Sequence, residues 1–249
     1  HFFFPSRFTE TPTTSTMKLS CRYGDWDSHS KIYTCSVASA SIFLQNQQIS
    51  EFVGLHLPGK SNQLVQGLRF DNTEVHFFPR GLQKAFPKLR WICIMNCGLL
   101  KISRDDLKGL ENISGLYLTK NKLQQLPDDL FDGMKSLRYI DLSYNKLEVL
   151  SSQLLSKIPA DQLVLADFRE NSAINAIYDS ESKISLEASV ELPELMRLLD
   201  ERCKKLPAKV VEMKIFGSKS VQTEAVVFKE SEEVFIAPDL VIIVDDRKF

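Results

Sequence analysis

The central part of the sequence repeats itself with a period of about two dozen residues. The segment 113–137 is followed by 137–158, and both fit the pattern L-x-x-L-x-L-x-x-N-x-L with an offset of 24 residues. Self-similarity at such a period is typical of solenoids, in which each unit buries its apolar edge against the next copy. We therefore expect a stack of coils whose short strands form one broad concave sheet.

Three columns of the pattern extend over five copies, with spacings of 24, 24, 24 and 26 residues. Two columns hold inward-facing apolar residues: Leu68, Ile92, Leu116, Ile140 and Ala166, then Phe70, Ile94, Leu118, Leu142 and Phe168. The third column, where the chain turns off the strand, holds Thr73, Cys97, Asn121, Asn145 and Asn171. An asparagine side chain there can satisfy backbone groups of its own and adjacent turns. We expect a less complete ladder in the two copies without asparagine.

These copies resemble leucine-rich repeats of the 24-residue type that is common in secreted proteins and cell-surface ectodomains. Asn121, Leu126, Pro127 and Phe131 carry the match to the longer form L-x-x-L-x-L-x-x-N-x-L-x-x-L-P-x-x-x-F. The resemblance implies an α/β fold, namely a leucine-rich repeat solenoid of about five repeats with a parallel concave sheet. It also implies an N-terminal cap and a small α+β extension at the C-terminus. The motif is specific for the fold and weakly specific for the partner.

We predict five segments along the chain: a disordered leader or linker (1–16), an N-terminal cap (17–63), the leucine-rich repeats (64–175), a C-terminal helical cap (176–208) and a short β-rich extension (209–249). The spacing of Leu195, Leu198 and Leu199 predicts a helix that begins near Leu192 and packs over the last coil. Short strands are expected at 210–216, 226–228, 234–236 and 240–244. The extension is interpreted as the start of a truncated domain.

The chain has five cysteines. Cys21 and Cys35 precede the first repeat, and the insect secreted and surface repeat proteins that the chain resembles often have a two-cysteine cap there. The resemblance implies a disulfide, with two free thiols as the alternative. Cys97 stands in the asparagine column, so we expect it to be buried. Cys93 is expected on the outward face of the sheet, and Cys203 is either a free thiol or an intermolecular linker.

The outward-facing residues of the sheet can be read from the register. The middle column holds Arg69, Cys93, Tyr117, Asp141 and Asp167, one flank holds Gly67, Trp91, Gly115, Tyr139 and Leu165, and the other holds Asp71, Met95, Thr119, Ser143 and Arg169. Because adjacent strands lie about 5 Å apart, the aromatic and methionine side chains should form one contiguous strip. Exposed aromatic residues on a rigid sheet anchor protein interfaces. The candidate ligand-binding residues are therefore Arg69, Trp91, Cys93, Met95, Tyr117, Thr119, Tyr139, Asp141, Ser143, Asp167 and Arg169.

Two other interpretations of this strip stay open: it covers a solvated sheet, or it is buried in a homodimer. Asn112 begins an N-glycosylation sequon and should reach solvent. The net charge of −1 offers no basic surplus for nucleic acid, and no run of about 20 apolar residues could span a bilayer. The four histidines lie outside catalytic and metal-binding motifs, so we expect no enzyme, no cofactor and no metal.

The leading hypothesis is a non-enzymatic binding protein, secreted or displayed on a cell surface. It would recognise a protein, glycan-bearing or pathogen-derived ligand through its concave face, in receptor or immune-type recognition. The alternative is a cytoplasmic substrate adaptor, because PDLVIIVDDRKF (238–249) looks like the opening strands of a BTB/POZ domain cut off at Phe249. A third hypothesis is a mainly structural module.

Overall fold

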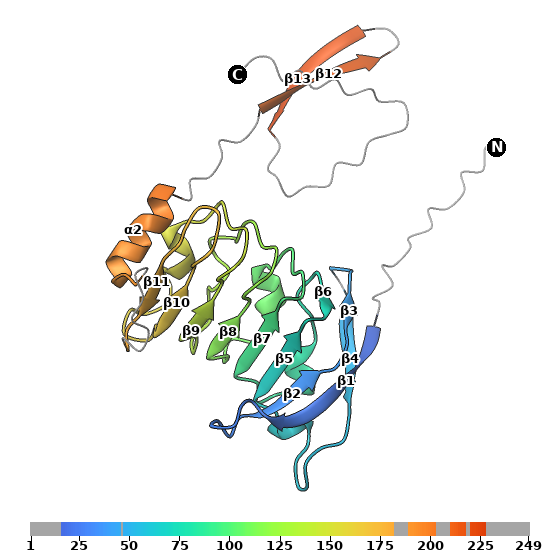
Figure 1. Cartoon of the computed structure of the whole chain (residues 1–249). Helices are drawn as coiled ribbons and strands as arrows, with labels where there is room; N and C mark the ends of the chain where they lie inside the picture. The colour runs from blue at the N-terminus through green and yellow to red at the C-terminus, as the bar shows by residue number, and fades with distance from the viewer. Residues whose placement is uncertain (1–15, 46, 182–188, 203–209, 218–219, 228–249) are drawn as a thin grey trace, which may run out of the picture. The chain divides into compact units, whose positions relative to one another are not determined.

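The computed structural model describes residues 16–45, 47–181, 189–202, 210–217 and 220–227 (Figure 1). The chain divides into two compact units, His1–Lys204 and Lys205–Phe249. The first unit contains the repeats and their caps, and the second contains a two-stranded hairpin. Within the described residues, no helix is both long and apolar enough to cross a membrane.

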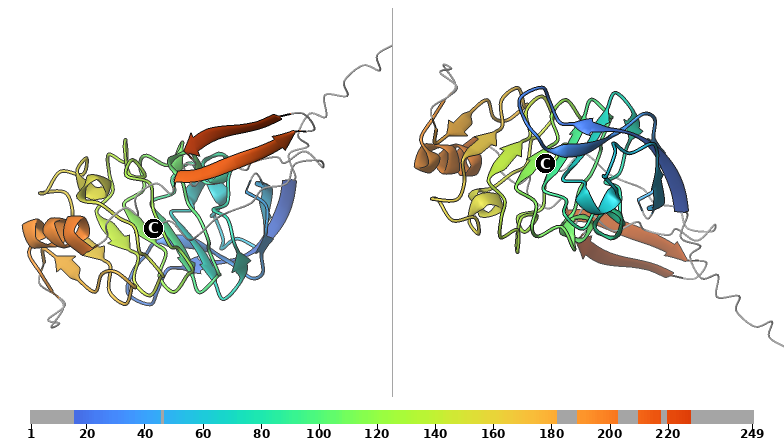
Figure 2. Two further views of the ribbon diagram at one scale, coloured as in Figure 1. Left: turned by 90° about the horizontal axis from the view of Figure 1, so that it is seen from above. Right: turned by 90° about the horizontal axis from the view of Figure 1, so that it is seen from below.

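The first unit is built on a nine-stranded sheet in the order β11-β10-β9-β8-β7-β5-β2-β1-β4. Five successive coils each contribute one parallel strand: β5 (Gly67–Asp71), β7 (Trp91–Met95), β8 (Gly115–Tyr117), β9 (Tyr139–Asp141) and β10 (Leu165–Asp167). These strands pair without slippage, so that Leu68, Ile92, Leu116, Ile140 and Ala166 stand in one row. The predicted register of the five copies is thereby confirmed. The stacking of the coils can be followed from above and from below in Figure 2.

The inward columns form the core. Leu68, Ile92, Leu116 and Ile140 are fully buried, as are the phenylalanines of the next column. Burying one such side chain stabilises the fold by about 1.5–3 kcal/mol. The far side of the coils carries short helical turns: α1 (Leu82–Ala85), η2 (Arg104–Leu107) and η3 (Ser152–Leu155), while η1 (Asn62–Leu64) directly precedes β5. Each coil thus closes its apolar interior between a strand and a turn.

The asparagine column satisfies the backbone where each coil leaves the sheet. Asn121 Oδ1 accepts hydrogen bonds of 3.1 Å from the amides of Cys97 and Leu99, and its Nδ2 donates to carbonyls of its own coil and the preceding one. Asn145 and Asn171 accept equivalent bonds of 3.1 Å from amides of the preceding coil. In contrast, the Cys97 thiol lies 3.1 Å from the Met95 carbonyl, to which it donates, and 3.5 Å from the Thr73 hydroxyl. The ladder is less complete in the early copies, as predicted.

The residue before each ladder position has a left-handed backbone. Its φ angle lies between 52° and 57° in all five coils: Asn72, Asn96, Lys120, Tyr144 and Glu170. Side chains other than glycine and asparagine rarely adopt this conformation. Because lysine, tyrosine and glutamate adopt it here, the coil geometry overrides the local preference of the residue.

The N-terminal cap extends the sheet beyond the first repeat. β1 (Thr16–Asp25) and β2 (Tyr33–Val37) form an antiparallel hairpin, and β2 pairs in parallel with β5. β4 (Gln48–Val53) pairs in parallel with β1, while β3 (Ser41–Ile42) pairs with β6 (Glu74–Val75) in a separate two-stranded sheet. The predicted disulfide between Cys21 and Cys35 is present and joins β1 to β2. The cap therefore adds a further parallel strand, which the repeat pattern does not reveal.

The C-terminal end of the array is covered by β11 (Ile177–Asp179), which pairs antiparallel with β10, and by α2 (Leu192–Arg202). Leu195 and Leu199 of α2 are fully buried in the core. The amide of Ser152, in the coil that begins with β9, donates a 2.8 Å hydrogen bond to Asp200 Oδ1. The prediction of a capping helix that begins near Leu192 is confirmed.

The second unit contains β12 (Val210–Gly217) and β13 (Ser220–Val227), paired antiparallel over their full length. The strand predicted at 210–216 is present. The second strand begins at Ser220, earlier than the predicted 226–228. The strands predicted at 234–236 and 240–244, the BTB/POZ-like segment and Cys203 lie outside the described residues.

Candidate functional site

Two glycines allow indole rings to lie flat against the outward face of the sheet. Gly67 and Gly115 occupy the same flanking column as Trp91. A Cβ atom on Gly115 would lie 2.4 Å from Cε3 of Trp91, and one on Gly67 would lie 2.4 Å from Oγ1 of Thr34 and 2.8 Å from Cε3 of Trp26. Carbon atoms in contact normally stay about 3.5–4.0 Å apart. Any other residue at these glycines would push the indoles off the sheet.

The rings that lie on this face form a continuous row, which we call the aromatic floor: Trp26, Tyr117, Trp91 and Tyr139. The ring centroids of Trp91 and Tyr117 are 6.2 Å apart in a stacked arrangement, and those of Trp91 and Tyr139 are 5.4 Å apart. Trp26 adds a further contact, with its centroid 6.2 Å from that of Tyr117. All four side chains are half-buried, so each retains a surface that a ligand could contact. The predicted neighbours Trp91, Tyr117 and Tyr139 are indeed brought together.

Trp26 comes from the loop between β1 and β2, which folds over the beginning of the array. Its amide donates to the Ile32 carbonyl at 2.9 Å, and its carbonyl accepts from Arg69 Nη1 at 3.4 Å. The Arg69 guanidinium also lies 5.3 Å from the centroid of the Trp26 ring, a cation–π distance. Sequence reasoning missed Trp26 because it lies outside the repeats. Its position between the two bridged cysteines was the available signal.

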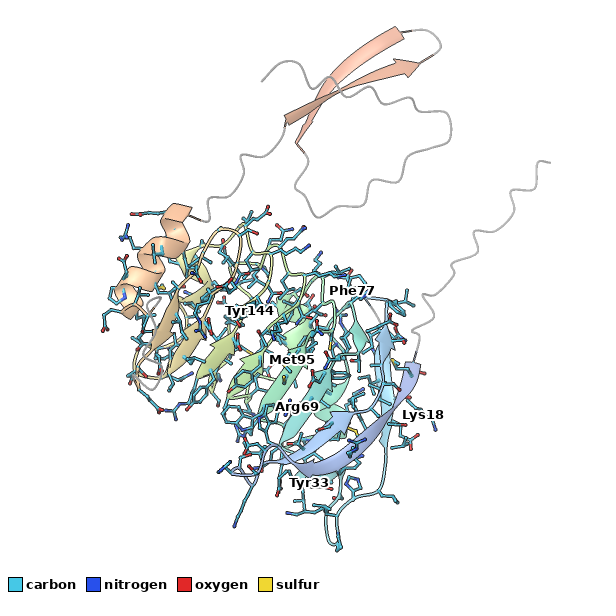
Figure 3. The ribbon with its side chains drawn as sticks, viewed as in Figure 1. Lys18, Tyr33, Arg69, Phe77, Met95 and Tyr144 are labelled. Carbon is cyan, nitrogen blue, oxygen red and sulfur yellow. A yellow bond between two sulfur atoms is a disulfide. The ribbon has the colours of Figure 1, made fainter. Side chains whose placement is uncertain are left out.

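Arg69 and Met95 lie on the neighbouring strands β5 and β7 (Figure 3). Arg69 lies in the middle column of β5, with its Nη2 3.7 Å from Asp71 Oδ2. Met95 is half-buried at the opposite end of β7 from Trp91. Met95 therefore lies beside the aromatic floor rather than within its row of rings.

Cys93 stands in the outward column as predicted, but only 6% of it is exposed. Arg69 and Tyr117, which pair with it on the two neighbouring strands, flank it on this face. Burial raises the pKa of the Cys93 thiol to about 12. The thiol is therefore protonated at neutral pH, and it fills space beneath the larger side chains. Cys97 is buried in the ladder, as expected.

Asp167 and Ser143 are also less accessible than their outward columns suggest. Asp167 is 4% exposed because the Arg169 guanidinium covers it, with Nε 2.9 Å from Oδ1 and Nη2 2.6 Å from Oδ2. Ser143 is buried, and its hydroxyl lies 2.8 Å from that of Thr119. These polar groups are thus partly engaged by hydrogen bonds and ion pairs within the face itself.

Asp141 is the carboxylate that lies next to the aromatic floor. Its Oδ1 accepts hydrogen bonds from the Ser143 amide at 3.0 Å and from the Ser143 hydroxyl at 2.6 Å. Since that hydroxyl donates to Asp141, it accepts from Thr119, so a relay of hydroxyl groups orients the carboxylate. Burial raises the pKa of Asp141, and Asp167 adds to the rise, while the Ser143 bonds and Arg169 oppose it.

The glycosylation candidate is Asn112. Asn112 is exposed, as predicted, in the turn before β8. Its carbonyl accepts a 2.6 Å hydrogen bond from Arg90 Nη1. The residue that would carry a glycan is therefore accessible to solvent.

Comparison with known families gives the repeat type. The model of the leucine rich repeat family matches residues 87–147 and 111–161. These residues form leucine-rich repeats, and the fold is a leucine-rich repeat solenoid. The family model covers the central coils of the solenoid, and the structure extends the same register to β5 and β10.

Leucine-rich repeat proteins of the extracellular type are similar to this chain. The transforming growth factor beta activator LRRC33 of Danio rerio is 25% identical over 161 residues, which cover 50% of this chain and 24% of that protein. Fibromodulin of Gallus gallus is 34% identical over 143 residues, covering 57% and 35% respectively. The chain therefore spans about a third or less of the length of these relatives.

A chain in the solved structure of the Drosophila Toll–Spatzle complex is also similar. It is 14% identical, with a TM-score of 0.22, over 51% of this chain and 27% of that one. The BTB/POZ-like resemblance of residues 238–249 stays a prediction.

Proposed function

We propose that this leucine-rich repeat protein acts outside the cell and recognises a protein ligand, of its own organism or of a pathogen, through the concave face. It does so without catalysis. The observation that carries the proposal is the aromatic floor, in which four large rings from three coils and the N-terminal cap share one surface. Tryptophan and tyrosine are the residues that most often dominate the binding energy of protein interfaces.

The rigidity of the surface supports the same role. Trp91 is held between the sheet at Gly115 and the rings of Tyr117 and Tyr139. Trp26 is held by Gly67 and Arg69. Side chains that are already ordered lose little conformational entropy when a ligand binds, which favours affinity.

The extracellular assignment is supported by the Cys21–Cys35 disulfide, since such bonds persist mainly in oxidising compartments. The exposed sequon at Asn112 fits the same environment. One relative is named as an activator of transforming growth factor beta, which is itself a protein. A protein ligand for the present chain is in keeping with that name.

The proposal can be tested by affinity enrichment. The full chain, produced in a secretory host, is immobilised and incubated with extracellular fluid of the source organism, and bound proteins are quantified by mass spectrometry. The variant Trp91→Ser/Tyr139→Ser removes two rings of the aromatic floor. The control Phe43→Ser/Leu100→Ser removes two large apolar side chains outside the nine-stranded sheet, which are 44% and 45% exposed.

We expect the same proteins to be enriched by the wild type and the control and to be lost from the aromatic-floor variant. Both variants should first show the far-ultraviolet circular dichroism of the wild type and a cooperative unfolding transition, so that loss of binding reports the surface and not unfolding. Ligands retained by the aromatic-floor variant, or lost equally from both variants, would contradict the proposal.

A further inference from the structure

We propose that the concave face binds a positively charged side chain of its ligand, arginine or lysine, in a cradle formed by Asp141, Tyr117, Tyr139 and Trp91. This inference rests on the proposed function, because it names the chemistry that the same surface recognises. The occupant is a guanidinium or ammonium group presented by a protein or peptide.

The first argument is the pairing of charges on this face. Asp71 has Arg69 within 3.7 Å, and Asp167 has Arg169 within 2.6 Å. Asp141 has no cationic group within ion-pair distance among the described residues, although it is half-buried. Its Oδ1 is occupied by Ser143, while its Oδ2 accepts no hydrogen bond from that part of the chain.

A half-buried carboxylate without a cation is costly, because it has lost part of its hydration without a compensating partner. Arg169 is close enough to affect Asp141 electrostatically, but its guanidinium is engaged in the two-pronged contact with Asp167. An incoming cation would therefore find an oriented acceptor, held by the relay from Thr119 through Ser143. A charge-assisted hydrogen bond of this kind is stronger than a neutral one.

The second argument is that three rings of the aromatic floor lie beside the carboxylate. Tyr117 pairs directly with Asp141 across β8 and β9, and Tyr139 stands two residues before Asp141 on the same face of β9. Trp91 is the third ring, with its centroid 5.4 Å from that of Tyr139. Cations bind favourably over such ring faces within about 6 Å of the centroid. Burial also raises the pKa of Tyr117, so its phenol stays neutral.

Ring faces beside a carboxylate fit a guanidinium particularly well. Its plane stacks on an aromatic ring while its edge donates hydrogen bonds to an acceptor. An uncharged glycan could stack on the same rings, but it would leave the Asp141 charge uncompensated. The combination therefore favours a cation, and a glycan is distinguished by the experiment below.

The two tryptophans of the chain are Trp26 and Trp91, and both belong to the aromatic floor. Tryptophan emission of the full chain therefore reports this surface directly. The probe is the peptide acetyl-Gly-Arg-Gly-Arg-Gly-amide, titrated while the emission is recorded. The same peptide with citrulline at both arginines is the neutral match, and chitotriose serves as the glycan probe. Asp141→Asn removes the charge of the cradle, and Asp71→Asn removes an equal charge elsewhere on the same face.

We expect saturable binding of the arginine peptide and at least tenfold weaker binding of the citrulline peptide and of chitotriose. Asp141→Asn should weaken the arginine peptide at least tenfold, and Asp71→Asn should change its affinity less than threefold. Equal binding of the neutral probes, equal loss in the two variants, or no saturation with the arginine peptide would each overturn the cradle. If the cradle fails while Trp91→Ser/Tyr139→Ser still abolishes ligand enrichment, the proposed function survives without it.

Discussion

Replacing Gly115 by alanine should displace Trp91 and disturb the aromatic floor. The added Cβ would lie 2.4 Å from Cε3 and 2.6 Å from Cζ3 of Trp91, and 2.9 Å from Cε2 of Tyr117. Because normal carbon contacts begin near 3.5 Å, the indole must move by about 1 Å or rotate away from the sheet. Overpacking of this kind typically costs about 1–3 kcal/mol. Rotation would instead sacrifice the two ring contacts of Trp91, each worth about 0.5–1.5 kcal/mol.

We therefore expect Gly115→Ala to lower the free energy of unfolding by about 1–3 kcal/mol in urea denaturation. The near-ultraviolet circular dichroism of the tryptophans should change as well. Gly24→Ala on β1 is the matched control, because nothing lies within 4 Å of its added Cβ. At an unstrained site such a change is neutral or stabilises by less than about 1 kcal/mol. The reasoning is refuted if Gly115→Ala is as stable as Gly24→Ala and its tryptophan spectrum is unchanged.

Three further predictions concern stability. Asn121→Ala should lower the free energy of unfolding by about 2–5 kcal/mol, because two buried backbone amides lose their acceptor. Urea denaturation checks this against Gln124→Ala, a change at an exposed position. Equal stability of the two variants would argue against the asparagine ladder. Asp141→Asn should raise the melting temperature at neutral pH, because the folded state raises the pKa of this carboxyl and so penalises its ionised form. That penalty is absent below the ordinary carboxyl pKa and appears as the pH rises toward the folded-state pKa. The gain in melting temperature from Asp141→Asn should therefore shrink on acidification. A gain that does not depend on pH would contradict a raised pKa for Asp141. Removing the Cys21–Cys35 disulfide, which spans a sequence separation of 14, should lower the free energy of unfolding by about 3 kcal/mol. Urea denaturation of Cys21→Ala/Cys35→Ala against the wild type tests this value. Intact mass under non-reducing conditions tests the bond itself, and native protein with both thiols free would count against the extracellular assignment.

The repeat register could be predicted because its cause is local and recurs in every coil. An apolar residue at each inward position and an asparagine at each exit from the strand reflect the same burial and hydrogen-bonding needs. The positions of Asn121 and Asn145 therefore predict where the neighbouring strands lie and how they align. The less complete ladder at Cys97 could be anticipated for the same reason, since a thiol lacks the donors and acceptors of an amide.

The register does not predict how accessible each outward-facing side chain is, because a neighbouring side chain can cover it. Asp167 faces outward by pattern, yet the Arg169 guanidinium, two residues away on the same chain, folds back over it. Cys93 is small and lies between two large neighbours. Accessibility here depends on side-chain conformation and neighbour size, which the period of the sequence does not encode.

The contribution of the cap was missed for a different reason. Trp26 belongs to a loop with no counterpart in the repeats, so no column places it on the concave face. The role of Gly67 could not be predicted either, because a glycine in a strand column does not indicate which side chain of another segment fills the space above it. Only the structure shows that the missing Cβ makes room for the Trp26 indole.

The most direct test of the central claim is hydroxyl-radical footprinting of the protein with and without its enriched ligand. The four side chains of the aromatic floor are reactive reporters of that face, and Tyr144, which is 52% exposed outside the aromatic floor, is the internal reference. We predict strong protection of Trp91, Tyr117 and Tyr139 on ligand binding, with Tyr144 unchanged. Protection of Tyr144 while the aromatic floor stays as reactive as in the free protein would contradict recognition through the concave face.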